Sequence, residues 1–97
     1  MGQMKNYIIS YWLRHPETNY SKFYDSLKKN YPKYIHIMEE TWFIKTTDNA
    51  KEIRNKLQNE LAFDESIFVT EINMDNYAGW MATSGFRFLE KDEGLGN

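Results

Sequence analysis

The stretch that decides the fold is Tyr7-Ile8-Ile9-Ser10-Tyr11-Trp12-Leu13, the best strand candidate in the chain. It is rich in β-branched and aromatic residues, which favour strands. Successive side chains of a strand point to opposite faces. The apolar row is Tyr7, Ile9, Tyr11 and Leu13, and the mixed row is Ile8, Ser10 and Trp12. We expect a central strand over about 5–13, with the apolar row against helices and the mixed row on the other face.

The length of 97 residues predicts one domain, which we place at 1–91 and follow with a flexible tail at 92–97. Aromatic residues make up 16% of the chain. Large rings bury area efficiently and are enriched at interfaces, so a homodimer that completes the core is consistent with the composition. The net charge of −2 disfavours broad nucleic-acid binding, since phosphate-binding proteins are usually basic, although a local basic patch is still allowed.

Cysteine is absent, which excludes disulfides and thiolate metal sites and fits a reducing compartment. No apolar run approaches the roughly 20 residues that cross a membrane, and no signal-peptide pattern opens the chain. We therefore expect a cytoplasmic protein that does not contact a membrane.

Helical spacing predicts a first helix from an Asn19 N-cap to about Asn30, ended by Pro32. Residues 34–38 and 41–46 are predicted as two strands joined at Glu39-Glu40. Glu-Glu is not a favoured two-residue turn, so one long bent strand with a bulge is the alternative.

A second helix is predicted after Asn49, because Asn49 and Glu52 fit a capping box and an apolar residue recurs every four positions. A strand over 66–73 follows. Residues 77–80 read as a structural anchor whose Gly79 permits a turn closed to other residues, and 83–91 as a short strand or helix.

The predicted order is β-α-β-β-α-β with an aromatic C-terminal extension, which is the ferredoxin-like sandwich of the α+β class. Right-handed crossovers place both helices on one face of an antiparallel sheet. Two strands nevertheless carry apolar residues on both faces. Phe68 and Ile67 point to opposite faces of one strand, and Phe43 and Trp42 point to opposite faces of the other. Such strands are normally covered on both faces. We expect a second copy to cover the open face, with the extension contributing.

Three segments together resemble the SinR-like family of short bacterial and phage proteins, which is distinct from the helix-turn-helix repressor of that name. They are Tyr7–Leu13, Thr41–Thr46 running into the Asn49-capped helix, and Tyr77-Ala78-Gly79-Trp80. The resemblance covers about residues 4–89. That family is similar to the small CRISPR-associated dimeric nuclease of spacer acquisition and to the VapD ribonuclease toxins. The resemblance implies a ferredoxin-like homodimer.

In those relatives the first strand ends in Tyr-Asp, and the resemblance implies that this Asp holds a divalent metal at the dimer interface. The corresponding position here is Trp12, whose indole offers no oxygen ligand to Mg²⁺. We therefore predict no catalytic residue, no metal site and no cofactor.

The candidate interface or ligand-binding residues are Tyr11, Trp12, Arg14, His15, Trp42, Tyr77 and Trp80. For Trp12, ordinary packing within the chain is the commoner role, and contact with a ligand or partner is the alternative. His15 and His36 are too isolated for a metal pair; His15 is expected as a solvated loop residue and His36 as a half-buried strand residue. Asp64, Glu65, Glu71 and Asp75 could in principle gather around a cation, but scattered surface carboxylates are commoner.

Two functions follow. The first is a non-catalytic homodimeric module that binds a protein partner, such as a phage or mobile-element factor acting on a host protein. The second is a metal-dependent ribonuclease or deoxyribonuclease in which Asp64, Glu71 or Asp75 replaces the lost aspartate. A ligand pocket between protomers, lined by Tyr11 and Trp12, is neither supported nor excluded.

Overall fold

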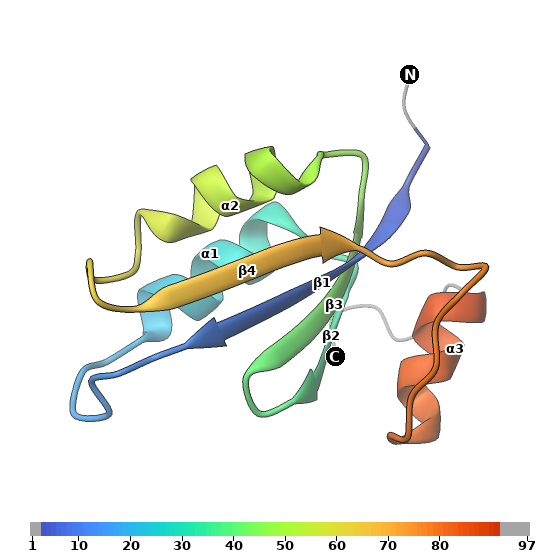
Figure 1. The fold of residues 1–97 in the computed structure, drawn as a ribbon. Coiled ribbons are helices and arrows are strands. Elements are labelled where there is room, and N and C mark those ends of the chain that lie inside the picture. The colour runs from blue at the N-terminus through green and yellow to red at the C-terminus, as the bar shows by residue number, and fades with distance from the viewer. Residues whose placement is uncertain (1–2, 92–97) are drawn as a thin grey trace.

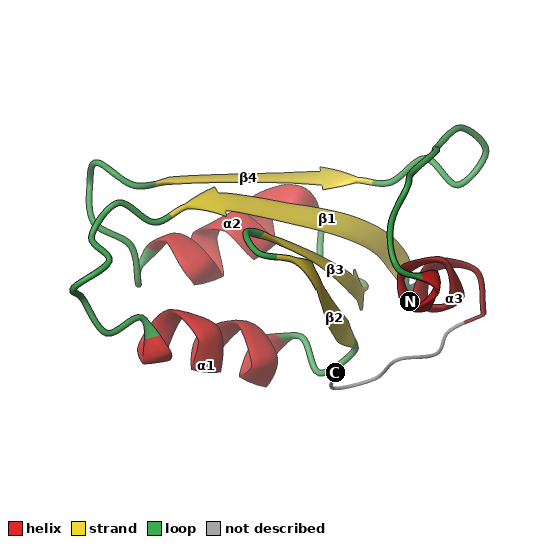
Figure 2. Ribbon diagram, turned by 90° about the horizontal axis from the view of Figure 1, so that it is seen from below, coloured by secondary structure: helices red, strands yellow, loops and turns green. Residues whose placement is uncertain are grey.

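The computed structural model describes residues 3–91, so the predicted tail at 92–97 lies outside the described part. The elements, in chain order, are β1 (Lys5–Trp12), α1 (Ser21–Asn30), β2 (Tyr34–Met38), β3 (Thr41–Thr46), α2 (Ala50–Gln58), β4 (Ser66–Glu71) and α3 (Thr83–Lys91). The fold is α+β, with one four-stranded antiparallel sheet in the order β2-β3-β1-β4. Helices α1 and α2 lie together along the sheet, and α3 stands apart from them at one end (Figure 1, Figure 2).

The first strand is central, as predicted. β1 pairs with β3 on one side and with β4 on the other, and Ile9 lies opposite both Trp42 and Val69. β1 therefore occupies an inner position in the sheet, between β3 and β4.

The face of the sheet that carries α1 and α2 holds the larger core, and we call it the helix face. Tyr7, Ile9 and Tyr11 pack there with residues of both helices and of β3, as the alternation predicted. The other buried members of this cluster are Phe23, Leu27, Tyr31, Tyr34, Trp42, Ile44, Ile53 and Leu57. Full burial of one such side chain stabilises by about 1.5–3 kcal/mol, so this cluster dominates the fold.

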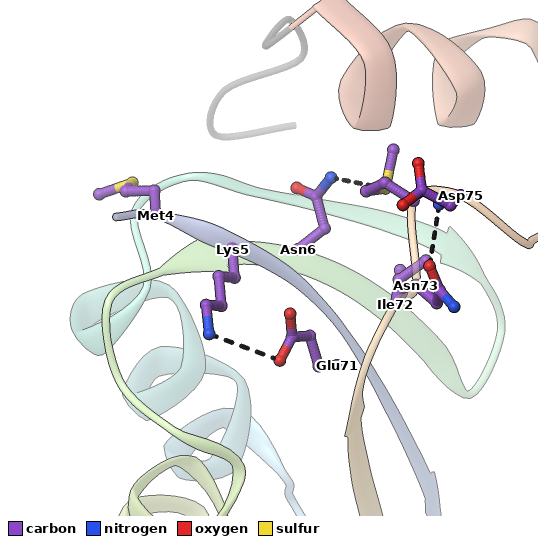
Figure 3. A pocket seen from close by; sticks show the side chains of 8 residues that line it. Met4, Lys5, Asn6, Glu71, Ile72, Asn73 and Asp75 are labelled. Atoms are coloured by element: carbon purple, nitrogen blue, oxygen red, sulfur yellow. Dashed lines mark hydrogen bonds and ion pairs between the residues drawn. The ribbon is translucent and has the colours of Figure 1, made fainter. Parts of the chain in front are cut away.

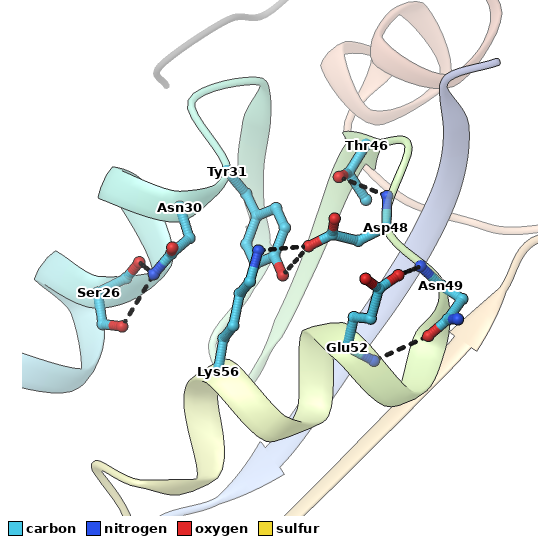
Figure 4. A network of polar contacts seen from close by, with 8 residues as sticks. All are labelled: Ser26, Asn30, Tyr31, Thr46, Asp48, Asn49, Glu52 and Lys56. Atoms are coloured by element: carbon cyan, nitrogen blue, oxygen red, sulfur yellow. Dashed lines mark hydrogen bonds and ion pairs between the residues drawn. The ribbon is translucent and has the colours of Figure 1, made fainter. Parts of the chain in front are cut away.

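Helix α2 begins with the predicted capping box. Asn49 Oδ1 accepts the Glu52 N–H at 2.8 Å, and Glu52 Oε1 accepts the Asn49 N–H at 2.8 Å (Figure 4). Just before it, the Asp48 carboxylate accepts from the Tyr31 hydroxyl at 2.9 Å and from Lys56 Nζ at 2.8 Å. The Lys56 hydrogen bond lowers the pKa of Asp48. These contacts join the start of α2 to the end of α1.

The start of α1 differs from the prediction by one residue. The N-cap is Tyr20, which makes no side-chain cap, and Asn19 Oδ1 instead accepts the Ser21 N–H at 2.8 Å. Asn19 therefore closes a local side-chain turn one position early, as short polar side chains commonly do.

Residues 34–46 form two strands, and the alternative of one long strand is wrong. A register shift between His36 and Met38 nevertheless marks an irregularity in β2. Residues 83–91 are helical, which settles the alternative of a strand.

The face opposite α1 and α2, which we call the open face, is covered at one end by α3. Phe88 and Leu89 of α3 pack with Ile35 and Phe43 of the sheet. Gly85 permits this close approach, because a Cβ there would lie 2.8 Å from Ile37 Cδ1. The expectation for Gly79 is wrong, since its φ is not in the left-handed region. No helix among residues 3–91 is long and apolar enough to cross a membrane.

Candidate interaction surface

The uncovered end of the open face carries large apolar side chains. Trp12 is 54% exposed and Phe68 is 68% exposed. Phe68 lies opposite Ser10, and Trp12 lies opposite Ser66, so the two rings are diagonal neighbours on one face. They extend a surface that continues through the half-buried Ser10 toward β3.

Two more exposed side chains border this surface where it meets α3. Met38 is 50% exposed, and Trp80 is fully exposed. Both line a hollow of about 200 Å³ together with Ile8, Phe43 and Tyr77. That volume is below the roughly 300–1,000 Å³ of small-molecule sites, so it suits a side chain of a protein partner. We call Trp12, Met38, Phe68 and Trp80 the apolar patch.

The Trp12 ring also contacts the positively charged side chain of Arg14. The Arg14 guanidinium carbon lies 4.2 Å from the centroid of the Trp12 ring, which is a cation–π contact. The structure thus brings two of the predicted site residues together. Trp12 therefore packs within the chain against Arg14, but it belongs to neither buried cluster and stays 54% exposed.

Tyr11 and Trp42 lie on the helix face, where both are buried. Trp42 Nε1 donates to the Tyr11 hydroxyl at 2.8 Å, and burial raises the pKa of Tyr11. His36 is exposed rather than half-buried, and its ring stacks on Trp42 at 4.5 Å between centroids. Since Tyr11 and Trp12 point to opposite faces, one pocket in a single copy cannot use both. The alternation of side chains along the first strand already indicates that Tyr11 and Trp12 lie on opposite faces.

Tyr77 and Trp80 are separated in role. Tyr77 is half-buried in the open-face cluster, and its hydroxyl donates to the Glu90 carboxylate, which raises the pKa of Tyr77. Tyr77 therefore anchors α3, whereas the Trp80 side chain stands in solvent.

His15 belongs to a polar cluster that the sequence did not reveal. The His15 ring Nε2 lies 3.0 Å from Asp64 Oδ1, and the His15 backbone N–H donates to the Tyr20 hydroxyl at 2.9 Å. The Tyr20 hydroxyl in turn donates to the Glu65 carboxylate, which also accepts from the backbone N–H of Arg14 at 3.1 Å. The hydrogen bond to Asp64 raises the pKa of His15, and the same bond lowers the pKa of Asp64. We call His15, Tyr20, Asp64 and Glu65 the end clamp.

The carboxylates proposed for a cation are not brought together. Glu71 and Asp75 line one hollow of about 500 Å³, where Lys5 Nζ lies 3.8 Å from Glu71 (Figure 3). Asp64 and Glu65 lie just before the start of β4, at the other end of that strand. Within the described part of the chain, no three His, Asp or Glu side chains are placed to share a metal ion.

No family model, no curated protein and no solved structure matches this chain. The resemblance to the SinR-like family accordingly stays a proposal, and we infer a function from the geometry of the open face.

Proposed function

We propose that the protein is a non-catalytic homodimeric interaction module that binds a protein partner through the apolar patch. The observation that carries this proposal is the gathering of four large exposed apolar side chains on one face. Single exposed hydrophobic residues are ordinary, but large apolar side chains gathered on one face mark an interaction site. Trp12 and Phe68 are diagonal neighbours, and Met38 and Trp80 line one hollow. Tryptophan, which supplies two of the four, is also enriched among the residues that dominate binding energy.

The size of the patch supports the same proposal. With roughly 200 Å² for each large side chain, the exposed fractions correspond to about 500–600 Å² of apolar surface. A standard interface buries about 800 Å² per partner, of which roughly 55–65% is apolar. The patch therefore supplies about the apolar area that one side of such an interface needs.

The strand order and the first strand support the finer parts of the proposal. The order β2-β3-β1-β4, with α1 and α2 as the two crossovers, supports a ferredoxin-like assignment. By the SinR-like resemblance, Trp12 corresponds to the position of a metal-binding Asp, and its side chain is 54% exposed. On this proposal the position has changed from holding an ion to contacting a protein. A cytoplasmic factor of a phage or mobile element, acting on a host protein, is the setting we favour.

Light scattering tests the homodimer. The chain mass is 11.7 kDa, so a dimer shows twice that value at tens of micromolar protein. A strictly monomeric protein at that concentration contradicts the homodimeric module. Trp12→Asp then tells which surface joins the copies: a weakened dimer places the patch between them, and an unchanged dimer leaves the patch for another protein.

The nuclease alternative has its own decisive assay. The protein is incubated with RNA and with DNA, in Mg²⁺ or Mn²⁺ and in chelator. Metal-dependent cleavage that is lost in Asp64→Asn, Glu71→Gln or Asp75→Asn replaces the interaction module with an enzyme.

A further inference from the structure

The two edges of the sheet are protected to different degrees. The β2 edge has only five residues, follows Pro32, and is broken by the register shift between His36 and Met38. The β4 edge has six residues in unbroken register with β1, and it contains no proline and no lysine. Short length, proline, bulges and lysine are the usual means of preventing another strand from adding to an edge. The β4 edge has no proline, no bulge and no lysine.

The register shows which backbone groups of β4 point away from β1; of these, the Glu71 carbonyl oxygen accepts from the Thr70 hydroxyl at 3.5 Å. The Ile72 N–H donates to the Asn6 carbonyl oxygen at 2.9 Å, so residues 66, 68, 70 and 72 turn their polar groups toward β1. The N–H and C=O groups of Ile67, Val69 and Glu71 consequently point away from the sheet. Among residues 3–91, no strand pairs with this side of β4.

A groove between α2 and β4 runs beside these groups. One hollow of about 440 Å³ is lined by Lys51, Arg54 and residues 67–69. A second hollow of about 490 Å³ also includes Arg54 and Ile67 and extends to Phe63, whose side chain is fully exposed. Beside residues 67–69 the groove is thus apolar along the strand and cationic along α2, and Glu65 lines its far end. It suits an extended segment that has apolar residues and acidic ends.

β4 itself has that chemistry. The segment 64–71 carries Asp64, Glu65 and Glu71 around Ile67, Phe68 and Val69, and it contains no Lys or Arg. In an antiparallel pair centred on Val69, Ile67 of one copy lies opposite Glu71 of the other, on the side where Arg54 lines the groove. The edge is therefore complementary to itself in both hydrogen bonding and charge.

We propose that a second copy of this chain adds its β4 to this edge, antiparallel and about a two-fold axis at Val69. The inference rests on the proposed homodimer and specifies its contact. The outward N–H and C=O groups of each copy pair with those of the other, and the sheets join into one of eight strands. Both apolar patches then lie on the same side of that sheet, where they offer a protein partner a doubled surface.

Charge reversal tests this contact by light scattering over a dilution series of the full chain. Arg54→Glu or Glu71→Arg alone places like charges together and weakens the dimer about tenfold, and the double variant restores it. Lys22→Glu changes the net charge equally on α1 and serves as the matched control. Val69→Pro removes an outward N–H without removing a ladder bond to β1, and it yields a monomer whose circular dichroism is that of the folded protein.

The outcomes separate this inference from the proposed function. A wild-type monomer overturns both. A wild-type dimer that Arg54→Glu, Glu71→Arg and folded Val69→Pro leave unchanged overturns the β4 contact alone, and so does a double variant as weak as the single ones. If Trp12→Asp weakens that dimer instead, the copies meet through the apolar patch and the module stands without the β4 contact.

Discussion

Both faces of the sheet carry large apolar side chains along β3, but the two faces are covered to different extents. On the helix face, Trp42 and Ile44 are buried under two helices. On the open face, α3 buries Phe43 at one end and leaves Phe68 and Trp12 in solvent at the other. Composition alone therefore does not say whether an apolar strand face is core or binding surface.

The difference follows from how each helix is attached. Helices α1 and α2 are crossovers, held at both ends by strands of the sheet. Within residues 3–91, helix α3 comes after β4 and is joined to the sheet by the segment that precedes it and by its own contacts (Figure 1). A helix held in this way covers what its one apolar stripe can reach. The remainder of the open face stays available to another chain.

The largest expected effect compares the cores of the two faces. Phe23→Ala on α1 should reduce the free energy of unfolding by about 3–5 kcal/mol, because Phe23 is fully buried in the helix-face cluster. Phe88→Ala should cost less, roughly 1–3 kcal/mol, since α3 can detach while the sheet stays folded. Urea unfolding measures both losses.

Hydrogen exchange distinguishes the two mechanisms. Phe88→Ala should lower amide protection in α3 but keep it in β1, whereas Phe23→Ala should lower it throughout. Lys22→Ala and Arg87→Ala are the exposed neighbours that control for each helix. Equal loss of protection in β1 from both Phe variants contradicts the view that α3 is a separable cover.

A smaller effect is expected in the apolar patch. Phe68→Thr should change the free energy of unfolding by no more than about 0.5 kcal/mol, because Phe68 is mostly exposed and threonine also favours strands. The change is measured at a protein concentration at which wild type and variant are both monomeric, so that association does not contribute. A loss of several kcal/mol would mean that Phe68 is part of the core rather than of a binding surface.

The elements set by local chemistry were predictable. The alternation at 7–13 assigned Tyr7, Ile9 and Tyr11 to the helix face, and the capping box at Asn49 was visible because both of its members lie within one helical turn. Aromatic type did not separate core from surface. Tyr11 and Trp42 were candidates for an interface and are buried, although the parity of Tyr11 within its strand already placed it in the core row.

The features set by register were not predictable. The end clamp joins His15 to Asp64 and Tyr20 to Glu65, across 49 and 45 positions of the chain. These contacts form because Trp12 pairs with Ser66, which brings the loop after β1 beside the loop before β4. Neither loop contains a sequence motif that indicates contact with the other loop. The end clamp could therefore be predicted only if the register of β1 and β4 were already known.

The smallest expected effect concerns this end clamp, which holds the end of the sheet that α3 does not cover. The pKa of His15 is raised above 6.5, so the stability it contributes is complete below that value and is lost as the pH rises through its folded pKa. The pKa of Asp64 is lowered below 3.8, so its contribution is complete above that value and is lost as the pH falls through its folded pKa. The wild type should therefore exceed His15→Gln in stability most between about pH 4 and 6.5.

Thermal unfolding of wild type, His15→Gln, Asp64→Asn and the double variant, from pH 3 to 9, measures this difference. The double variant should lose no more than either single variant, because each removes the same bond. A difference that is constant across the whole pH range would show that the charges of His15 and Asp64 do not hold this end. In that case the uncovered end of the open face would depend on backbone pairing between β1 and β4 alone, and its resistance to opening would be the same at every pH.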